Sequence, residues 1–256
     1  MTRTAIITGA ASGIGLATAR ELKSRGWTLG LIDIDENSLA TIAQELGAAA
    51  ALADVSSPNE MEEAFRDLST ALGRIHAIFN NAGILRGGPF EEVPLSVHHT
   101  QMDVHMKGVV NGCHLAFPYL REKGGTIVNM SSSSAVYGIP RFSTYGASKS
   151  FISRVTEALS IEWEAHGISV HAVEVPFVAT PMIADEDHPI QSYVKSEGVK
   201  VEPEDVARQV ADIFEGEAGR GPIHAMTWQL KQLKLADRLL PQRIMRGVIK
   251  KISEKT

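Results

Sequence analysis

Three residues in the second half of the chain could carry proton chemistry together: Ser132, Tyr145 and Lys149. Tyr145 and Lys149 are four positions apart, so a helix would place both side chains on one face. A phenol with a pKa of about 10 is a poor base at neutral pH, but a neighbouring ammonium favours the phenolate. Tyr145 could then exchange a proton with a substrate hydroxyl while Ser132 holds the reacting oxygen. The alternative interpretation of Tyr145 and Lys149 is an exposed amphipathic pair.

A glycine-rich turn near the N-terminus could hold a diphosphate. The apolar run Thr4–Thr8 is typical of a buried strand, and three glycines separate it from a helical pattern. Glycines let the backbone pass close to a diphosphate, and the N-terminus of the next helix offers unpaired N–H groups and a partial positive charge. The alternative is a tight turn that only allows close packing. The residues expected at this turn are Gly9, Ser12, Gly13, Ile14 and Gly15.

An acidic residue at the end of the next apolar run refines this prediction. Asp33 closes the run Thr28–Asp33, and a carboxylate there accepts hydrogen bonds from ribose hydroxyls and repels a 2′-phosphate. No basic residue stands at Ser12 or Ile34, where one could bind that phosphate. The pattern therefore favours NAD over NADP. Asp33 could also be only a turn residue at the end of its strand.

Further motifs follow in order, and together they resemble the short-chain dehydrogenase/reductase family over roughly residues 3–215. The glycine spacing is similar to the TGxxxGxG of that family rather than to the GxGxxG of two-domain dehydrogenases. Tyr145 follows Ser132 by 13 positions, as in the serine and YxxxK pair of the family. The other matching segments are Asp54-Val55, Asn80-Asn81-Ala82-Gly83 and Thr180.

The resemblance implies a function and a role for each of these positions. It implies a hydride transfer between NAD and a secondary alcohol or ketone, with Tyr145 as general acid and base and Lys149 on the nicotinamide ribose. It also implies a homodimer or homotetramer joined through helices near residues 95–121 and 144–166. The further cofactor-binding residues that it implies are Asp54, Val55, Asn81, Ala82, Gly83, Val178 and Thr180.

The chain departs from the family pattern at three places. His105 stands where the family has an asparagine that kinks a long helix and whose backbone carbonyl holds a proton-relaying water. His105 could titrate in that relay near neutral pH, or it could only pack at a helix irregularity. Val175-Pro176 stands where the family has Pro-Gly, so the following loop is expected to take another path. A glycine-rich C-terminal ending is also missing.

Apolar runs alternate with helical patterns along the chain, which predicts parallel strands joined by helical crossovers. The fold class is therefore α/β, a Rossmann-type doubly wound sheet of about seven strands with helices on both faces. We expect one domain over residues 1–225, with a substrate loop near 177–201, and a helical extension over 226–256. Strands are predicted at 4–8, 28–33, 49–53, 76–80, 126–130 and 168–175, and helices at 14–25, 38–46, 58–72, 95–121, 144–166 and 227–252, the last interrupted near Pro241.

Composition excludes several classes of protein. The chain has 256 residues with 44% hydrophobic residues, enough for a full core. The single cysteine, Cys113, excludes an internal disulfide and a cysteine-based zinc site. No apolar run approaches the length of a membrane span, and the N-terminal residues lack the pattern of an export signal, so we expect a cytoplasmic protein without a metal site.

The net charge of −5 conceals an uneven distribution. Residues 224–256 contain eight basic and two acidic residues, which gives +6, and the rest of the chain carries −11. An acidic body argues against nucleic-acid binding. The tail is amphipathic and basic, so it could lie on the surface of the body, cover the substrate entrance, contact another subunit or rest on an anionic membrane.

The substrate is expected to be hydrophobic, of steroid, retinoid or lipid type. Glu174 resembles a variant of hydroxysteroid- and retinol-type family members, although it could simply be a polar strand end. Two other functions stay open: a non-catalytic nucleotide-binding regulator, and a peripheral membrane enzyme that reduces lipid ketones with NADP. Apolar residues expected near the substrate are Leu85, Ile139, Phe142, Phe177 and Met182.

Overall fold

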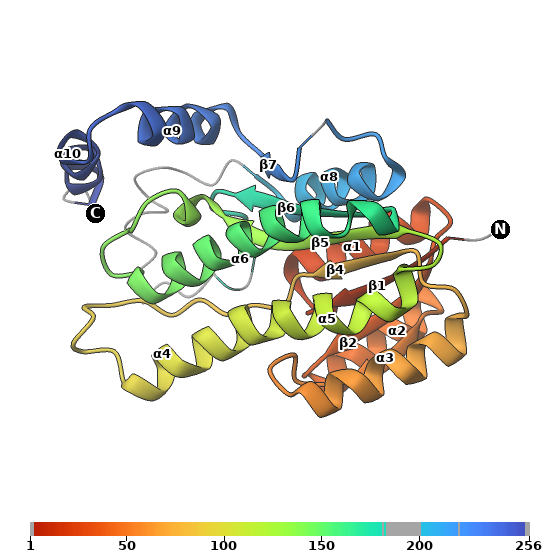
Figure 1. Cartoon of the computed structure of the whole chain (residues 1–256). Coiled ribbons are helices and arrows are strands. Elements are labelled where there is room, and N and C mark those ends of the chain that lie inside the picture. The colour runs from red at the N-terminus through yellow and green to blue at the C-terminus, as the bar shows by residue number, and fades with distance from the viewer. Residues whose placement is uncertain (1–2, 181, 183–200, 220, 254–256) are drawn as a thin grey trace.

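A seven-stranded parallel sheet forms the centre of the protein in a computed structural model, in the order β3-β2-β1-β4-β5-β6-β7 (Figure 1). The structure describes residues 3–180, 182, 201–219 and 221–253. The predicted α/β class and doubly wound topology are confirmed. The strands are β1 (Thr4–Thr8), β2 (Thr28–Asp33), β3 (Ala49–Leu52), β4 (Ala77–Asn80), β5 (Gly125–Ser132), β6 (Ile168–Val175) and β7 (Ile223–Ala225).

Helices cover both faces of this sheet (Figure 1). Consecutive side chains of β1 point to opposite faces: Ile7 packs in the apolar cluster of α1, α2 and α8, and Ile6 packs in that of α3, α5 and α6. Both faces are therefore apolar, as expected for a buried parallel sheet. The helices are α1 (Gly13–Ser24), α2 (Glu36–Leu46), α3 (Pro58–Leu72), α4 (Leu95–Met102), α5 (Gly108–Leu120), α6 (Ser143–Glu162), α8 (Pro203–Glu215), α9 (Trp228–Leu239) and α10 (Gln242–Ser253).

The strand order reverses beside β1, which pairs with β2 on one side and β4 on the other. The connections after β1 and β4 therefore leave in opposite directions and open a crevice at the carboxyl edge of the sheet. The glycine turn follows β1 and the segment Asn81–Gly83 follows β4, so the topology places these two predicted elements on either side of that crevice.

The predicted single helix over 95–121 is wrong in its middle. A π-helical segment, Asp103–Lys107, separates α4 from α5, and it contains His105. The predicted helix over 144–166 ends earlier, because α6 stops at Glu162 and a short 3₁₀ turn, Glu164–His166, follows. The interruption near Pro241 is confirmed by the gap between α9 and α10. Most of the predicted substrate loop over 177–201 lies outside the described residues.

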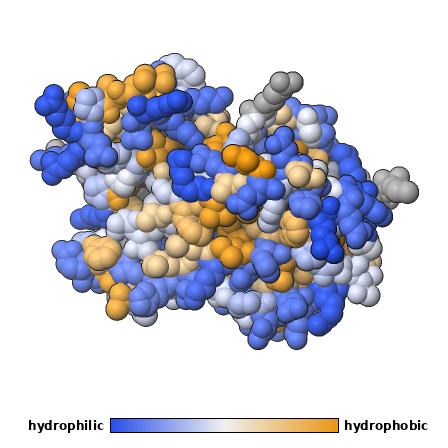
Figure 2. Space-filling model, in the orientation of Figure 1, coloured by the Kyte–Doolittle hydropathy of each residue, from blue (hydrophilic) through white to orange (hydrophobic). Residues whose placement is uncertain are grey.

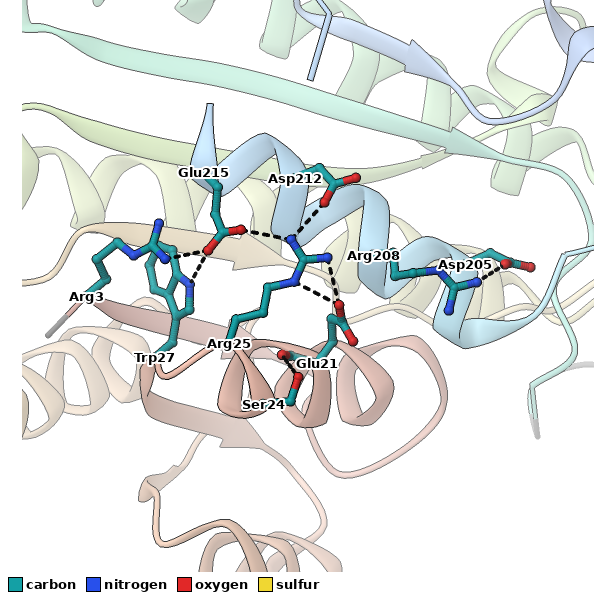
Figure 3. Close-up of polar contacts among 9 residues, drawn as sticks. All are labelled: Arg3, Glu21, Ser24, Arg25, Trp27, Asp205, Arg208, Asp212 and Glu215. Carbon is teal, nitrogen blue, oxygen red and sulfur yellow. Dashed lines mark hydrogen bonds and ion pairs between the residues drawn. The ribbon is translucent and has the colours of Figure 1, made fainter. Parts of the chain in front are cut away.

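Arg25 connects α1 to α8 through ion pairs (Figure 3). Arg25 lies 2.8 Å from a carboxylate oxygen of Asp212 and 2.9 Å from one of Glu215, and it also pairs with Glu21 of α1. Burial opposes its charge, but these carboxylates raise the pKa of Arg25 above its ordinary value. Trp27 Nε1 donates to Glu215 as well, at 3.3 Å. The network holds α1, whose N-terminus faces the crevice, against the body.

None of the helices in the described part of the chain is long and apolar enough to cross a bilayer.

Candidate active site

The glycine turn has a backbone that only glycine adopts easily. Gly9 and Gly13 have φ of +62° and +51°, in the left-handed region. A Cβ on Gly15 would lie 2.0 Å from the carbonyl oxygen of Gly9, so any side chain there would push the turn away from α1. Ser12, the N-cap of α1, makes no side-chain capping bond within the described residues. The first-turn N–H groups of α1 are thus available to an anion.

Hydrogen bonds from the β4 side fix this turn. Asn81 Nδ2 donates to the carbonyl oxygens of Thr8 and Gly9, both at 3.1 Å. In return, Thr8 Oγ1 accepts from the backbone N–H groups of Asn81 and Ala82, at 3.0 and 3.1 Å. The two sides of the crevice therefore form one rigid unit. Sequence reasoning missed the role of Thr8, because a threonine that ends a strand has no distinctive spacing.

Asp33 accepts hydrogen bonds from the backbone and also borders the crevice. One carboxylate oxygen accepts from the N–H of Ala11 at 2.8 Å, and the other accepts from the N–H groups of Ile34 and Asp35. Asp33 also lines the cavity. Asp33 therefore does stabilise the turn at the end of β2. The same carboxylate also borders the cavity, so the two interpretations do not exclude each other.

The remaining predicted cofactor residues surround the same space. Asp54 and Val55 line it at the end of β3, and Asp54 Oδ1 accepts from the N–H of Ser56 at 2.8 Å. Val178 is buried and pairs with Val201 through an isolated bridge. Thr180 lies over the glycine turn, since a Cβ on Gly13 would meet its methyl group at 3.4 Å. The loop after Val175-Pro176 thus reaches the turn.

Ser134 orients the hydroxyl of Ser132 toward the cavity. Its Oγ accepts from the backbone N–H of Ser134 at 3.2 Å and from the Ser134 hydroxyl at 3.0 Å. With these donors in place, the Ser132 proton can point into the cavity, and the nearby Ser132 hydroxyl favours the ionised form of the Tyr145 phenol. Sequence reasoning missed Ser134, because a run of four serines does not indicate which one orients another.

In the protein without its cofactor, the pKa of Tyr145 is raised and not lowered. Burial raises the pKa of Tyr145, and the hydrogen bond from Ser132 only partly opposes that rise. Lys149 Nζ lies 5.6 Å from the centre of the phenol ring and donates to the carbonyl oxygen of Met130 at 3.0 Å. The predicted shared face of Tyr145 and Lys149 is confirmed on α6, but the ammonium is directed to the end of β5.

Lys149 is itself perturbed by burial. Burial lowers the pKa of Lys149 to about 8, so the ammonium form still predominates at neutral pH. The bond to Met130 uses one of its three donors. The other two are available to a hydroxyl in the cavity.

His105 packs as a neutral ring beneath Tyr145. Its Nε2 accepts from the N–H of Ile84 at 3.1 Å, so the ring proton is on Nδ1, which contacts Ser148 Oγ at 2.7 Å. Ser148 donates onward to the carbonyl oxygen of Tyr145 at 2.7 Å. Burial, followed by the nearby charge of Lys149, lowers the pKa of His105 well below its ordinary value. The suggestion that His105 titrates near neutral pH is therefore wrong, and the packing interpretation is supported.

These groups surround one cavity of about 440 Å³. Among the predicted site residues, Gly15 alone is missing from its described lining, because it packs behind Gly9. The wall beside Tyr145 is apolar: Leu85 and Phe142 are buried there, and Ile139 and Phe177 pack against them. All five residues expected near the substrate line the cavity: Leu85, Ile139, Phe142, Phe177 and Met182.

Glu174 is not in the described lining of the cavity but lies behind it. It is almost entirely buried, and its two oxygens accept from Ser153 Oγ at 3.1 Å and from Lys234 Nζ at 2.7 Å. Ser153 Oγ lies 2.9 Å from Ser131 Oγ, which donates to the carbonyl oxygen of Lys149. A chain of polar contacts thus runs from Lys234 on α9 to the backbone of Lys149 on α6.

Comparison with known proteins gives the same family for sequence and structure. The sequence profile described as short chain dehydrogenase matches residues 3–191. Cyclohexanol dehydrogenase of Acinetobacter sp. (strain SE19) is 31% identical over 223 residues, which cover 84% of this chain and 89% of that protein. The 3-beta-hydroxysteroid dehydrogenase of Comamonas testosteroni is 31% identical over 185 residues, which cover 71% and 73%.

A solved structure of a short chain dehydrogenase/reductase from Burkholderia phymatum in complex with NAD has the same fold. It matches with a TM-score of 0.82 and 25% identity, over 96% of this chain and 95% of that one. The 3-ketoacyl-(acyl-carrier-protein) reductase from Brucella melitensis, complexed with NADH, matches with a TM-score of 0.80 and 25% identity, over 87% and 96%. The chain belongs to the short-chain dehydrogenase family of oxidoreductases.

Proposed function

We propose that the protein transfers a hydride between NAD and a secondary alcohol or ketone of apolar character. The observation that carries this proposal is the convergence of Ser132, Tyr145 and Lys149 on a cavity that also includes the glycine turn. NAD, when bound, supplies the carbon that accepts or donates the hydride. The protein supplies position, hydrogen bonds and the proton.

The glycine turn, the N-terminus of α1 and Asp33 fit a dinucleotide. The positive φ angles of Gly9 and Gly13 open a path for a diphosphate toward the first N–H groups of α1. Asp33 presents a carboxylate beside that path, which disfavours a 2′-phosphate. The solved relatives complexed with NAD and NADH support the same choice.

Tyr145 is proposed to move the proton. In alcohol oxidation it takes the hydroxyl proton of the substrate, and in ketone reduction it returns that proton. Ser132 donates to the reacting oxygen from the side opposite Ser134. Because burial raises the pKa of the phenol, the protein alone favours the protonated tyrosine, which is the form needed for reduction. Lys149 is within reach of a ribose hydroxyl with its two remaining donors.

The cavity wall supports an apolar substrate. Tyr145 packs against the same cluster as Leu85 and Phe142, so a carbonyl that reaches the phenol must lie along apolar side chains. Most of the polar side chains that line the cavity lie at or just after the carboxyl ends of β1 to β5. We also propose a homo-oligomer, supported by the exposed apolar residues Leu95 and Val110 along α4 and α5 and Ile161 on α6.

The variant Tyr145→Phe distinguishes an oxidoreductase that uses Tyr145 from a non-catalytic nucleotide-binding regulator. A panel of steroids, retinoids and aliphatic alcohols, followed by NADH absorbance, should reveal a substrate for the wild-type protein. Tyr145→Phe should then lose about a hundredfold to ten-thousandfold in turnover while it still binds NADH. The matched control is Tyr119→Phe, on α5 and away from the cavity. Unchanged turnover in Tyr145→Phe would exclude this mechanism.

Titration with NADH and NADPH tests the choice of cofactor. The quenching of protein fluorescence gives both affinities on the same sample. NADH should bind more tightly, because the Asp33 carboxylate repels the extra phosphate of NADPH. Tighter binding of NADPH would contradict the role given to Asp33.

A further inference from the structure

Helix α9 presents one apolar face to the body and another to the outside. Leu230 is buried, whereas Trp228, Leu235 and Leu239 are 67%, 57% and 69% exposed. Their spacing of seven and four residues places the three exposed side chains on one face, opposite Leu230. A soluble helix that only covers its own body would be polar on that outer face. The outer face of α9 therefore requires a partner.

Helix α10 also has exposed apolar residues, but they adjoin its buried side instead of lying opposite to it. Met245 and Ile249 are buried, whereas Ile244 and Val248, one turn apart, are exposed at the edge of the same apolar stripe. Figure 2 shows hydrophobic residues gathered over α9 and α10, with hydrophilic residues around them. We call the exposed residues Trp228, Leu235, Leu239, Ile244 and Val248 the tail face.

Basic side chains border the tail face. Lys231 and Arg238 are exposed on α9, and a helical rotation of 100° per residue places both along one side of the Trp228 stripe. Lys251 is exposed on α10 one turn beyond Val248. Residues 228–253 contain seven basic residues and one acidic residue, Asp237. The partner that complements such a surface is both apolar and negatively charged.

The fold fixes the direction of the tail face. Lys234 points inward to Glu174 at the end of β6, so α9 cannot rotate its apolar stripe toward the body without breaking a buried ion pair. Figure 1 places α9 and α10 beyond the carboxyl end of the sheet, the end at which the cavity lies. The tail face is thus a fixed outer surface of the protein.

A lipid bilayer fits these features better than a second copy of this chain. A twofold contact that pairs two α9 helices antiparallel would place Lys231 and Arg238 on the same side as these cations of the partner. An anionic bilayer surface instead accepts Trp and Leu side chains at its interface and attracts the bordering Lys and Arg. We propose that α9 and α10 dock the protein on an anionic lipid bilayer through the tail face.

Vesicle flotation of the full-length protein tests the proposal. Vesicles of phosphatidylcholine mixed with phosphatidylglycerol should carry the protein to the top of the gradient, and vesicles of phosphatidylcholine alone should carry much less. Binding should weaken as salt is raised, because the charge component is screened. Of the three tryptophans, Trp228 is exposed, Trp27 is buried, and Trp163 is half-buried against Phe117, away from α9 and α10. A blue shift of tryptophan emission on binding should therefore disappear in Trp228→Phe.

Matched variants separate the tail face from the rest of the surface. Leu235→Gln should weaken vesicle binding about tenfold, whereas Leu52→Gln, at a residue of similar exposure (53%) on β3, should not change it. Lys231→Gln with Arg238→Gln should weaken binding about tenfold or more, and Arg121→Gln with Lys123→Gln should have little effect. These two pairs remove equal charge.

Three results would overturn the proposal. The first is no flotation of the wild-type protein with anionic vesicles at low salt. The second is equal flotation of Leu235→Gln and wild type. The third is a molar mass from light scattering that falls in Leu235→Gln without any vesicle binding, which would assign the tail face to a second copy. None of these readouts depends on turnover, so the outcome is independent of the proposed activity.

Discussion

Lys234 and Glu174 form an ion pair between the C-terminal extension and the central sheet. Nζ lies 2.7 Å from Oε2, and Glu174 is almost entirely buried while Lys234 is about one-third exposed. Glu174 stands opposite Ser131 in the register of β5 and β6, one position before Val175 pairs with Ser132. The extension is therefore joined to the core directly behind the proposed catalytic serine.

Removal of the Lys234 cation should destabilise the protein strongly. Lys234→Met leaves a buried carboxylate without its cation, and we expect a loss of about 2–4 kcal/mol in the free energy of unfolding by urea. Glu174→Gln keeps an acceptor for Ser153 and should cost about 1 kcal/mol. The double variant should be close to Glu174→Gln alone, which gives a large coupling energy. Lys231→Met, an exposed control on the same helix, should change stability by less than about 0.5 kcal/mol. Equal effects of Lys234→Met and Lys231→Met would contradict the pair.

His105→Asn should keep most of the activity. The amide can accept from the N–H of Ile84 and donate toward Ser148, so the support of Tyr145 is largely retained. We expect turnover within about tenfold of wild type. His105→Leu can do neither, and it should cost about 1–3 kcal/mol in stability because it leaves the half-buried N–H of Ile84 without an acceptor. A loss of turnover beyond about a hundredfold in folded His105→Asn would show a role greater than positioning.

Binding of NADH should weaken as the pH rises through about 8. The pKa of Lys149 is lowered to about 8, so its positive charge and one of its two spare donors are present below that pH and are lost above it. We expect the Kd for NADH, measured by fluorescence at constant ionic strength, to rise roughly fivefold to tenfold across this range. The step should persist in Tyr145→Phe, because burial moves the pKa of the phenol upward, out of this window. Lys149→Met should bind weakly at every pH, and a step of equal size in that variant would exclude Lys149 as its origin.

Protonation of Glu215 in acid should lower the free energy of unfolding. Its folded pKa is lowered: burial opposes the charge, but Arg25, Trp27 and Arg3 favour it more strongly. The folded chain therefore binds fewer protons than the unfolded chain, so this stabilisation is complete above the ordinary glutamate pKa of about 4.3 and is lost as the pH falls through the lower folded value.

The variant that tests this relation is Arg25→Gln. It should lose about 1–2 kcal/mol at neutral pH and show a shallower decline in acid, as measured by urea unfolding across the pH range. Arg66→Gln removes an exposed ion pair with Asp67 and should change stability by about 0.5 kcal/mol or less. An unchanged acid slope in Arg25→Gln would contradict the role of the network.

Local patterns were enough to predict the sheet and most of its helices. Fully apolar runs such as Thr4–Thr8 and Thr28–Asp33 indicate strands buried on both faces, and those two runs match β1 and β2 residue for residue. Pro58 begins α3 as its position predicts. Helix α8 was not predicted, although Pro203 and Gly216 stand at its two ends. Strand β7 was not predicted either, because a strand of three residues is too short to show a periodic pattern.

Spacing brought the site residues together but could not describe their environment. The i, i+4 relation of Tyr145 and Lys149 predicts a shared helix face, yet the direction of the Tyr145 pKa depends on burial that no spacing contains. The same holds for the pair of Glu174 and Lys234, which lie 60 positions apart in the sequence. Such contacts depend on how the helices and strands pack against one another. Local sequence patterns predict where these elements are, but not how they pack.

The π-helical segment Asp103–Lys107 makes this region tolerant of one particular change in length. A π turn is an α-helix with one residue inserted, so α4 and α5 are one helix that contains a single extra residue. Deletion of that residue would close the wide turn to regular helical geometry and leave α4 and α5 in the same relative orientation. Gln101, whose buried side chain accepts from the N–H of Arg86, would keep its partner. A deletion within α4 or α5 would instead rotate one part of the helix by about 100° relative to the other. A deletion scan should therefore find the π-helical segment more permissive than the two helices that flank it.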